Sequence, residues 1–200
     1  MKTNTIENAM TLFEQHAGQL RTSQAIRLGI APRTLYALRD AGRIEEVTRG
    51  VYRLPGAPVS EYADLVQVAL RIPKGVICLV SALAFHGLTT QIPHEVFVAL
   101  PLDAEKPRLA YPPVRLFWLS RPAYEAGVEE RVLDGVTVRL YSREKTIADC
   151  FKYRNKTGLS LALEALKEGL GQGCKPETLL EFARTDRVEK VMRPYLEALL

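Results

Sequence analysis

The stretch RTSQAIRLGIAPRTLYALRDAGRIEEVTRGVYRL, residues 21–54, decides the fold of the N-terminal part of this chain. Its pattern predicts two short helices separated by a tight turn and followed by a β-hairpin. Gly29 is suited to end the first helix in a left-handed conformation. Pro32 stands where the second helix should begin, because its fixed φ suits the first helical turn. This order of elements is typical of a winged helix-turn-helix.

The first of these helices has a capping signal and an apolar side. A side-chain oxygen of Thr22 or Ser23 is expected to accept the free N–H groups at its start. Ala25, Ile26 and Leu28 supply the apolar side that would face the core. The pattern therefore predicts a short helix that ends at the glycine.

The second helix divides into an inward and an outward side. Leu35 and Leu38 are three residues apart and are expected to point into the core. An arginine and a hydroxyl near the start of a helix suit the major groove, since arginine reaches guanine bidentately and a hydroxyl holds phosphate. The residues expected to face outward are Arg33, Thr34, Tyr36, Ala37 and Arg39.

The run IEEVTRGVYRL at residues 44–54 predicts the hairpin, with Gly50 supplying the positive φ that its turn needs. Arg49 is expected at the tip and Arg53 on the return strand, from which a wing touches DNA backbone or minor groove. A small helical domain without a nucleic-acid role, or a winged helix used for protein contact, is the alternative. The expected DNA-contacting residues are Arg21, Ser23, Arg33, Thr34, Tyr36, Ala37, Arg39, Arg49 and Arg53.

The charge of the chain is concentrated near its N-terminus. The 200 residues carry a formal net charge of +4 and are 47% hydrophobic, which is enough to build folded cores. Residues 1–56 hold eight Lys and Arg against five Asp and Glu, whereas residues 57–200 hold 19 against 18. The basic excess thus coincides with the predicted helix-turn-helix, as phosphate contact requires.

The cysteines and the hydropathy of the chain indicate in which cellular compartment it is expected. Cys78, Cys150 and Cys174 are too far apart for a metal cluster and too few for a disulfide framework. There is no N-terminal signal peptide, and no apolar run approaches the roughly 18 residues of a membrane span. We expect a cytoplasmic protein without a membrane partner.

The rest of the chain predicts a second, mixed α/β domain. A first helix is expected at residues 5–18, and the run Pro55-Gly56-Ala57-Pro58 predicts a linker, which divides the chain into domains 1–56 and 57–200. Residues 101–113 and 120–135 are expected to be exposed loops or hairpins. Strands are predicted at 76–80, 95–101, 114–119 and 136–141, and helices at 60–72, 81–88, 142–154, 158–170, 176–184, 186–193 and 194–199. The fold class is therefore α+β with a helical C-terminus.

The strongest candidate for a catalytic site is the pair of carboxylates Asp103 and Glu105, which follows a predicted strand. Nucleotidyltransferases hold magnesium with such a spacing. The Gly-Ser pair that should open a helix upstream is missing, and Lys106 and Pro107 indicate a turn. A solvated loop is favoured over a metal site.

The remaining ionisable residues give no catalytic pattern. Lys145 and Asp149 are four residues apart and are expected to form an exposed ion pair on one helix. His16, His86 and His94 do not cluster in the sequence. No nucleophile motif or phosphate-binding glycine loop occurs, so we expect neither enzyme activity nor a cofactor.

Three runs of sequence in this order resemble the AbiEi family, the antitoxins of bacterial type IV toxin–antitoxin (abortive infection) systems. They are TRGVYRLPG at 48–56, VSALAFHGLT at 80–89 and VRLYSREKTIADCFKYR at 138–154. The resemblance extends from about residue 5 to about residue 169. It implies an N-terminal domain that binds inverted repeats in its own promoter as a repressor. It also implies a C-terminal antitoxin domain that helps repressors cooperate on DNA.

The resemblance also implies partners and site positions. The DNA-contacting helix falls on Pro32–Ala41 and the wing on Thr48–Arg53. The expected partners are double-stranded DNA and, functionally, a nucleotidyltransferase-like toxin that is opposed without a stable complex. We expect a monomer in solution that binds DNA cooperatively. The alternatives are a nucleotidyltransferase-like enzyme with an N-terminal nucleic-acid-binding module, and a plain regulator without a toxin.

Overall fold

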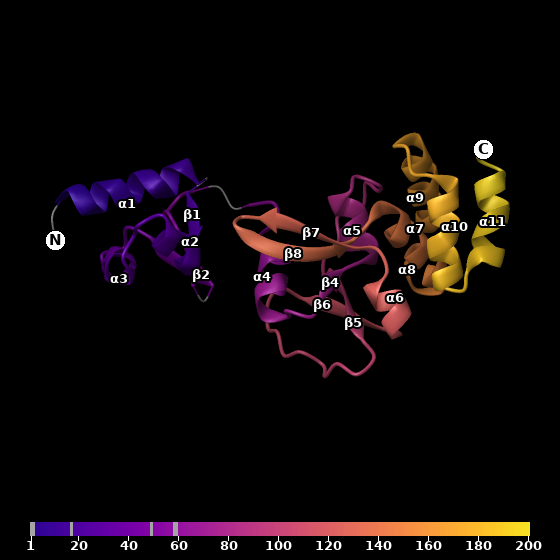
Figure 1. Ribbon diagram of the computed structural model, residues 1–200, viewed down its shortest axis with the longest axis horizontal. Helices are drawn as coiled ribbons and strands as arrows, with labels where there is room; N and C mark the ends of the chain where they lie inside the picture. Colours follow the sequence, from indigo (N-terminus) through magenta and orange to yellow (C-terminus); the bar gives the residue numbers. More distant parts are fainter. Residues whose placement is uncertain (1–2, 17, 49, 58–59) are drawn as a thin grey trace. The chain divides into compact units, whose positions relative to one another are not determined.

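The chain forms two compact units in a computed structural model that describes residues 3–16, 18–48, 50–57 and 60–200. The first unit comprises Met1–Gln67 with Val132–Thr137, and the second comprises Val68–Arg131 with Val138–Leu200 (Figure 1). Both helices and sheets are present, so the predicted mixed α+β class is confirmed. The predicted division after Gly56 remains a prediction.

The first unit combines three helices with a small antiparallel sheet of strand order β1-β3-β2. Leu20 of β1 pairs with Tyr52 of β3, and Glu45 of β2 pairs with Arg53 of β3. Its elements are α1 (Thr3–Gln15), β1 (Gln19–Arg21), α2 (Thr22–Arg27), α3 (Pro32–Asp40), β2 (Glu45–Thr48) and β3 (Val51–Arg53).

A single apolar cluster holds these elements together. Phe13 of α1, Leu20 of β1 and Leu35 of α3 have no exposed surface, and Ala25 of α2 joins them. Burying side chains of this size removes much apolar area from water, which is the main driving force for such a small unit. Leu35 and Leu38 are both buried, as their spacing predicts.

Two details of the first unit differ from the predictions. The strand β1 was not expected, and it ends at Arg21, the residue directly before α2. Ile26 and Leu28 are 47% and 36% exposed, so the prediction that both face the core is wrong. The reason is that α2 has only six residues, and its buried side is filled by Ala25.

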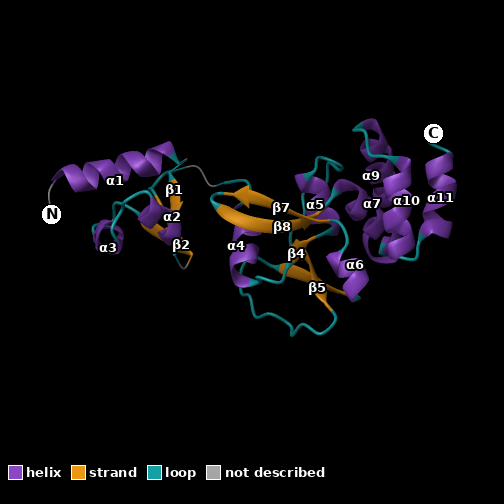
Figure 2. Ribbon diagram, in the orientation of Figure 1, coloured by secondary structure: helices purple, strands orange, loops and turns teal. Residues whose placement is uncertain are grey.

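The second unit contains a five-stranded mixed sheet, whose strands are orange in Figure 2, and its strand order is β6-β5-β4-β8-β7. β5 and β6 are parallel, β4 and β5 are antiparallel, and β4 and β8 are parallel. The helix α4 (Ala63–Arg71) crosses the division between the units. The strands are β4 (Val76–Ile77), β5 (Val96–Pro101), β6 (Val114–Leu119), β7 (Val128–Leu133) and β8 (Val136–Tyr141).

The helix α7 is the centre of the helical part of the second unit, and it contacts α5, α9, α10 and α11. Its residues Ile147 and Phe151 are fully buried, as is Tyr141 at the end of β8. Ser142 caps α7 by accepting from the Lys145 N–H at 3.3 Å. The helices are α5 (Leu79–Phe85), α6 (Arg121–Glu125), α7 (Arg143–Lys152), α8 (Arg154–Thr157), α9 (Leu159–Gly171), α10 (Pro176–Thr185) and α11 (Glu189–Glu197).

Most of the predicted elements of the second unit are confirmed, and three are corrected. The strand predicted at 76–80 stops at Ile77, because Leu79 adopts a φ of 46° and begins α5. The helix α6 was missed in the stretch 120–135, although Pro122 in its first turn is a helix-start signal. Pro194 lies inside the single helix α11, where two helices were predicted.

No helix among the described residues is long and apolar enough to cross a membrane.

Candidate nucleic-acid interface

The connection from α2 to α3 has the geometry that its sequence predicts. Gly29 adopts a φ of 90°, which a side chain would disfavour. The Ile30 N–H donates to the Ala25 carbonyl at 2.9 Å, and the Ile30 side chain is buried. Pro32 is the first residue of α3. The two helices are thus joined by a short turn that is anchored in the core.

Thr22 has a different role from the predicted helix cap. The position before α2 is Arg21, which makes no side-chain capping bond. The Thr22 N–H and hydroxyl instead both donate to the carbonyl of Gly50, at 2.8 and 3.2 Å. Gly50 adopts a φ of 75° at the turn between β2 and β3, as predicted. The start of α2 is therefore tied to the hairpin, and Ser23 is left exposed.

Two of the predicted contact residues are exposed on the first two turns of α3. Arg33 is exposed in its first turn, and Tyr36 is 46% exposed one turn further along. Ala37, the residue after Tyr36, is half-buried. An arginine at the start of an exposed helix has the reach that reading a base in the major groove requires.

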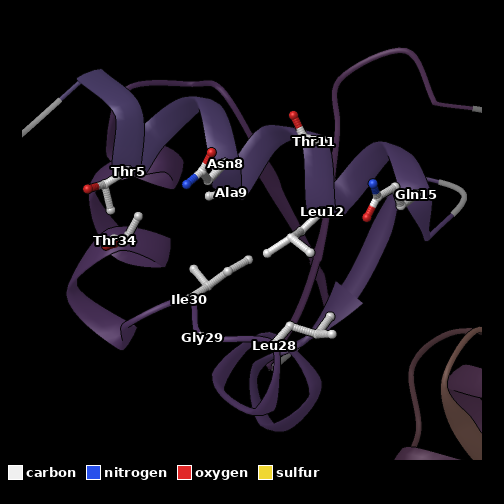
Figure 3. Close-up of a pocket in the computed structure, with 10 residues that line it drawn as sticks. All are labelled: Thr5, Asn8, Ala9, Thr11, Leu12, Gln15, Leu28, Gly29, Ile30 and Thr34. Carbon is white, nitrogen blue, oxygen red and sulfur yellow. The ribbon is translucent and has the colours of Figure 1, made fainter.

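Thr34 does not face outward, so that part of the prediction is wrong. Its side chain is only 2% exposed, and it lies on the side of α3 that faces α1, near Thr5 (Figure 3). Residues 34 and 38 are one helical turn apart and share a face, and Leu38 belongs to the core. The sequence of the turn does not predict the burial of Thr34, because it does not determine where α1 packs.

A groove of about 420 Å³ lies between α1 and the α2–α3 turn (Figure 3). Apolar side chains such as Leu12 and Ile30 point into it, with amides and hydroxyls around them. Its lining contains no charged side chain, so it is not suited to hold phosphate. The residues that line it are Thr5, Asn8, Ala9, Thr11, Leu12, Gln15, Leu28, Gly29, Ile30 and Thr34.

Four arginines of the first unit have no ion pair within the part of the chain that the structure describes. Arg33 is one of them, and Arg21 is another, half-buried at the end of β1. Arg27 and Arg43 complete the group, and both are exposed. An arginine without an internal partner is free to neutralise a phosphate.

Arg27 and Arg43 were missed by the sequence analysis. Arg27 lies four residues after Ser23, so helical spacing alone places the two on the same side of α2. Arg43 follows Gly42 after the end of α3, where no periodic pattern points to it.

Arg39 and Arg53 are engaged by carboxylates of the same unit. Arg39 pairs with Asp40 at 2.8 Å, and this partner raises the pKa of the guanidinium. Arg53 on β3 pairs with Glu45 on β2 at 2.5 Å. Arg49, the residue expected at the hairpin tip, lies outside the described residues.

The other ionisable candidates do not assemble into a site. Asp103 and Glu105 are both exposed after β5. Within the described ranges, no group of three or more His, Cys, Asp or Glu is placed to hold a metal ion. His86 caps α5, its Nε2 lies 2.8 Å from the Tyr141 carbonyl, and burial lowers its pKa.

The predicted exposed ion pair of Lys145 and Asp149 is buried instead. Both residues lie on the inner side of α7, where their side chains are 0% and 1% exposed. Asp186, which follows α10, completes the group. The helix periodicity gave the contact between the two residues correctly but could not show which side of α7 is covered by α10.

Comparison with known proteins gives one family and a structural relative. Residues 8–55, less than half of the chain, match the model of the family described as "Transcriptional regulator, AbiEi antitoxin". The resemblance inferred from the sequence is thus confirmed over those residues. No curated protein sequence matches the chain.

The crystal structure of the RV2827C protein from Mycobacterium tuberculosis is similar in fold. The TM-score is 0.55 at 13% sequence identity, over 97% of this chain and 81% of that one. At such low identity the likeness concerns the fold alone.

Proposed function

We propose that this chain is the antitoxin of a type IV toxin–antitoxin system and also represses its own promoter by binding DNA. The match of residues 8–55 to the AbiEi family supports the antitoxin and regulator role. The buried cores of both units support a folded protein rather than a short regulatory peptide. The chemistry proposed is recognition and occupancy, without catalysis and without a cofactor.

In this proposal the first unit works as a winged helix-turn-helix. The order α1-β1-α2-α3-β2-β3, with the β2–β3 hairpin after the second helix of the turn, supports this assignment. The helix α3 enters the major groove with its N-terminal half, and the hairpin approaches the DNA backbone. The tie between Thr22 and Gly50 keeps α2 and the hairpin in register during this contact.

The observation that carries the proposal is the exposure of Arg33 and its lack of an ion pair among the described residues. Arg33 lies in the first turn of α3, next to the exposed Tyr36. A guanidinium in this position can reach the O6 and N7 atoms of a guanine. Arg21, Arg27 and Arg43 supply further unpaired charge from neighbouring elements for phosphate contact.

Repression then follows from occupancy of inverted repeats in the promoter. Monomers bind the two half-sites cooperatively and exclude the polymerase, and α3 of each copy reads one half-site. The second unit carries the antitoxin activity against a nucleotidyltransferase-like toxin, without requiring a stable complex with it.

The direct test is binding of the full chain to the DNA upstream of its own gene, at two salt concentrations and against unrelated competitor DNA. We expect a specific complex that weakens steeply as salt rises. Arg33→Ala should weaken it by roughly 5- to 150-fold, which corresponds to the 1–3 kcal/mol of a lost bidentate base contact.

Arg108→Ala is the matched control, because Arg108 is an exposed arginine of the second unit and the change in net charge is the same. Equal binding by the Arg33→Ala and parent proteins would contradict the assignment of α3. Absence of a specific complex at both salt concentrations would contradict the DNA-binding proposal itself.

A further inference from the structure

The acidic residues of the first unit are arranged around two of its arginines. Arg39 on α3 donates through Nε and Nη2 to Asp40 Oδ1, at 3.0 and 2.8 Å. Its Nη1 also lies 3.8 Å from Glu46 Oε2, and its guanidinium stacks 5.3 Å from the centre of the Tyr36 ring. The guanidinium is therefore held along the surface of α3 by three neighbours.

Arg53 is held in the same way on the hairpin. Its Nε and Nη2 both donate to Glu45 Oε1, at 3.0 and 2.5 Å. Glu45 and Arg53 are directly paired across β2 and β3, so the register of the sheet sets this contact. The Arg53 side chain is 19% exposed, whereas the Glu45 side chain is 49% exposed.

Glu46 is itself fixed by the backbone. Its Oε1 accepts the Gly50 N–H at 2.9 Å, which anchors the carboxylate at the turn of the hairpin. Its other oxygen is the one that faces Arg39. The hairpin thus carries two successive carboxylates, Glu45 and Glu46, each directed at a different arginine.

We propose that Asp40, Glu45 and Glu46 are internal competitors for DNA phosphate, which hold Arg39 and Arg53 in ion pairs and thereby reduce binding to nonspecific DNA. This inference rests on the proposed DNA-binding function and concerns its specificity. It divides the arginines that the structure describes in the first unit into two groups. Those without an ion pair attract any DNA, whereas Arg39 and Arg53 must first be released from their carboxylates.

The physical basis is the difference between the two kinds of complex. Nonspecific binding derives almost entirely from phosphate neutralisation, so each arginine withheld from phosphate lowers it directly. Exposed ion pairs are weak. A phosphate that base contacts hold in position can displace the carboxylate, whereas a phosphate in a loosely placed complex competes poorly. The restraint therefore raises the ratio of specific to nonspecific affinity.

The test is the double variant Glu45→Gln and Glu46→Gln in the full chain. Glutamine keeps an oxygen that can accept the Gly50 N–H, so the hairpin retains that bond while the charges are removed. The matched control is Glu7→Gln with Glu14→Gln on α1, because both residues are exposed and the change in net charge is identical. Binding is measured on operator DNA and on unrelated DNA over a range of salt.

For unrelated DNA we expect the slope of log K against log salt to become steeper by about 1, since each phosphate contact contributes about 0.9 and Arg53 is released, whereas Arg39 stays paired with Asp40. Affinity for unrelated DNA near 0.1 M salt should rise by at most about fivefold for each released arginine, because a weak exposed ion pair withholds no more than that. Affinity for the operator should rise less, so the specificity ratio falls. Asp40→Asn relaxes only the restraint on Arg39 and should produce a smaller change of the same sign.

Two outcomes separate this inference from the function on which it rests. If the parent protein does not distinguish the operator from unrelated DNA, the proposed function fails. If the parent distinguishes them, but the Glu45→Gln and Glu46→Gln protein has the same specificity ratio and salt slope as the α1 control, the inference is overturned. Far-ultraviolet circular dichroism and the thermal transition of each variant verify that the first unit is folded in the comparison.

Discussion

Lys145 and Asp149 form an ion pair that is sealed from solvent: Lys145 Nζ lies 2.5 Å from Asp149 Oδ1. Asp186 approaches the same ammonium with its Oδ2 at 3.0 Å. The partly exposed Lys152 reaches the outer side of Asp186 at 3.4 Å. The aromatic ring of Tyr141 lies 4.7 Å from Lys145 Nζ. One ammonium thus connects α7 to the segment between α10 and α11 within the core of the second unit.

Removing this ammonium should destabilise the second unit strongly. Lys145→Ala leaves Asp149 buried without a cation and leaves Asp186 with only the partly exposed Lys152. Removing one partner of a buried pair typically costs about 3–5 kcal/mol. Denaturant unfolding can follow this unit selectively through Trp118 on β6, because it is the single tryptophan of the chain. Arg121→Ala, which removes an exposed pair with Glu125, is the control and should leave the midpoint close to that of the parent. An unchanged midpoint for Lys145→Ala would show that the group is not buried as described.

The same group should make the stability of the second unit depend on pH. Burial raises the pKa of Asp149 to about 7, against the opposing effect of Lys145 and with the added repulsion of Asp186. An unfolded aspartate has a pKa near 4. The folded state therefore binds more protons between about pH 4 and pH 7, and the free energy of unfolding should fall as pH rises through this window.

Asp149→Asn isolates that contribution, because asparagine resembles the protonated acid and does not titrate. Relative to the parent, we expect this variant to become progressively more stable as the pH rises from 4 to 7, with no further relative change above. The measurement is the Trp118 unfolding midpoint of both proteins at each pH. Asp103→Asn in the exposed loop is the matched control for the change from aspartate to asparagine. A stability difference between Asp149→Asn and the parent that does not vary with pH would contradict the raised pKa.

The turn between α2 and α3 could be predicted from the sequence because its demands are local. Gly29 needs a positive φ and Pro32 prefers the first turn of a helix, whatever surrounds them. The apolar strands β5, β6 and β8 were predicted for the same reason. The Ser142 cap is also local, since donor and acceptor are three residues apart.

What could not be predicted depends on contacts between distant segments. Thr34 is buried because α1 covers it, and its own helix gives no sign of this. The ion pair of Arg53 was not predicted either, because its partner Glu45 comes from the neighbouring strand. Lys145 and Asp186 are 41 residues apart, so no periodic pattern connects them. The residues that were misassigned are those whose surroundings are set by tertiary packing.

Thr34→Val tests the reassignment of this residue from the interface to the core of the first unit. Valine has nearly the same shape, and the side chain does not reach the outer side of α3. We therefore expect the operator affinity of Thr34→Val to lie within about twofold of the parent. This change is small compared with the roughly 5- to 150-fold loss expected for Arg33→Ala. Thr34→Arg should instead unfold or distort the first unit, because a charge would be buried there. A large loss of affinity for Thr34→Val with a normal thermal transition would return Thr34 to the interface.

Gly50→Ala should weaken the first unit through its hairpin. Gly50 adopts a φ of 75°, and an added Cβ would lie 3.3 Å from the Thr22 hydroxyl oxygen. An L-residue in a left-handed conformation costs about 1–2 kcal/mol. The control is Gly171→Ala at the end of α9, where there is open space and no positive φ, so it should be neutral or stabilising. Calorimetry measures the thermal transitions of the parent and of both variants. An equal destabilisation by Gly50→Ala and Gly171→Ala would contradict the prediction.

Repression and antitoxin activity should be separable by a single substitution if the two units have the proposed roles. Arg33→Ala removes a side chain that is exposed on α3 and leaves the core of each unit intact. We expect it to release a reporter gene placed behind the promoter of this chain. It should still restore the growth of cells that express the nucleotidyltransferase-like toxin of the proposed system. Lys145→Ala is the converse variant, since it destabilises the second unit, and it should fail to restore growth. If Arg33→Ala lost protection at normal protein levels, DNA binding and antitoxin activity would share one surface, and the division of roles between the units would be wrong.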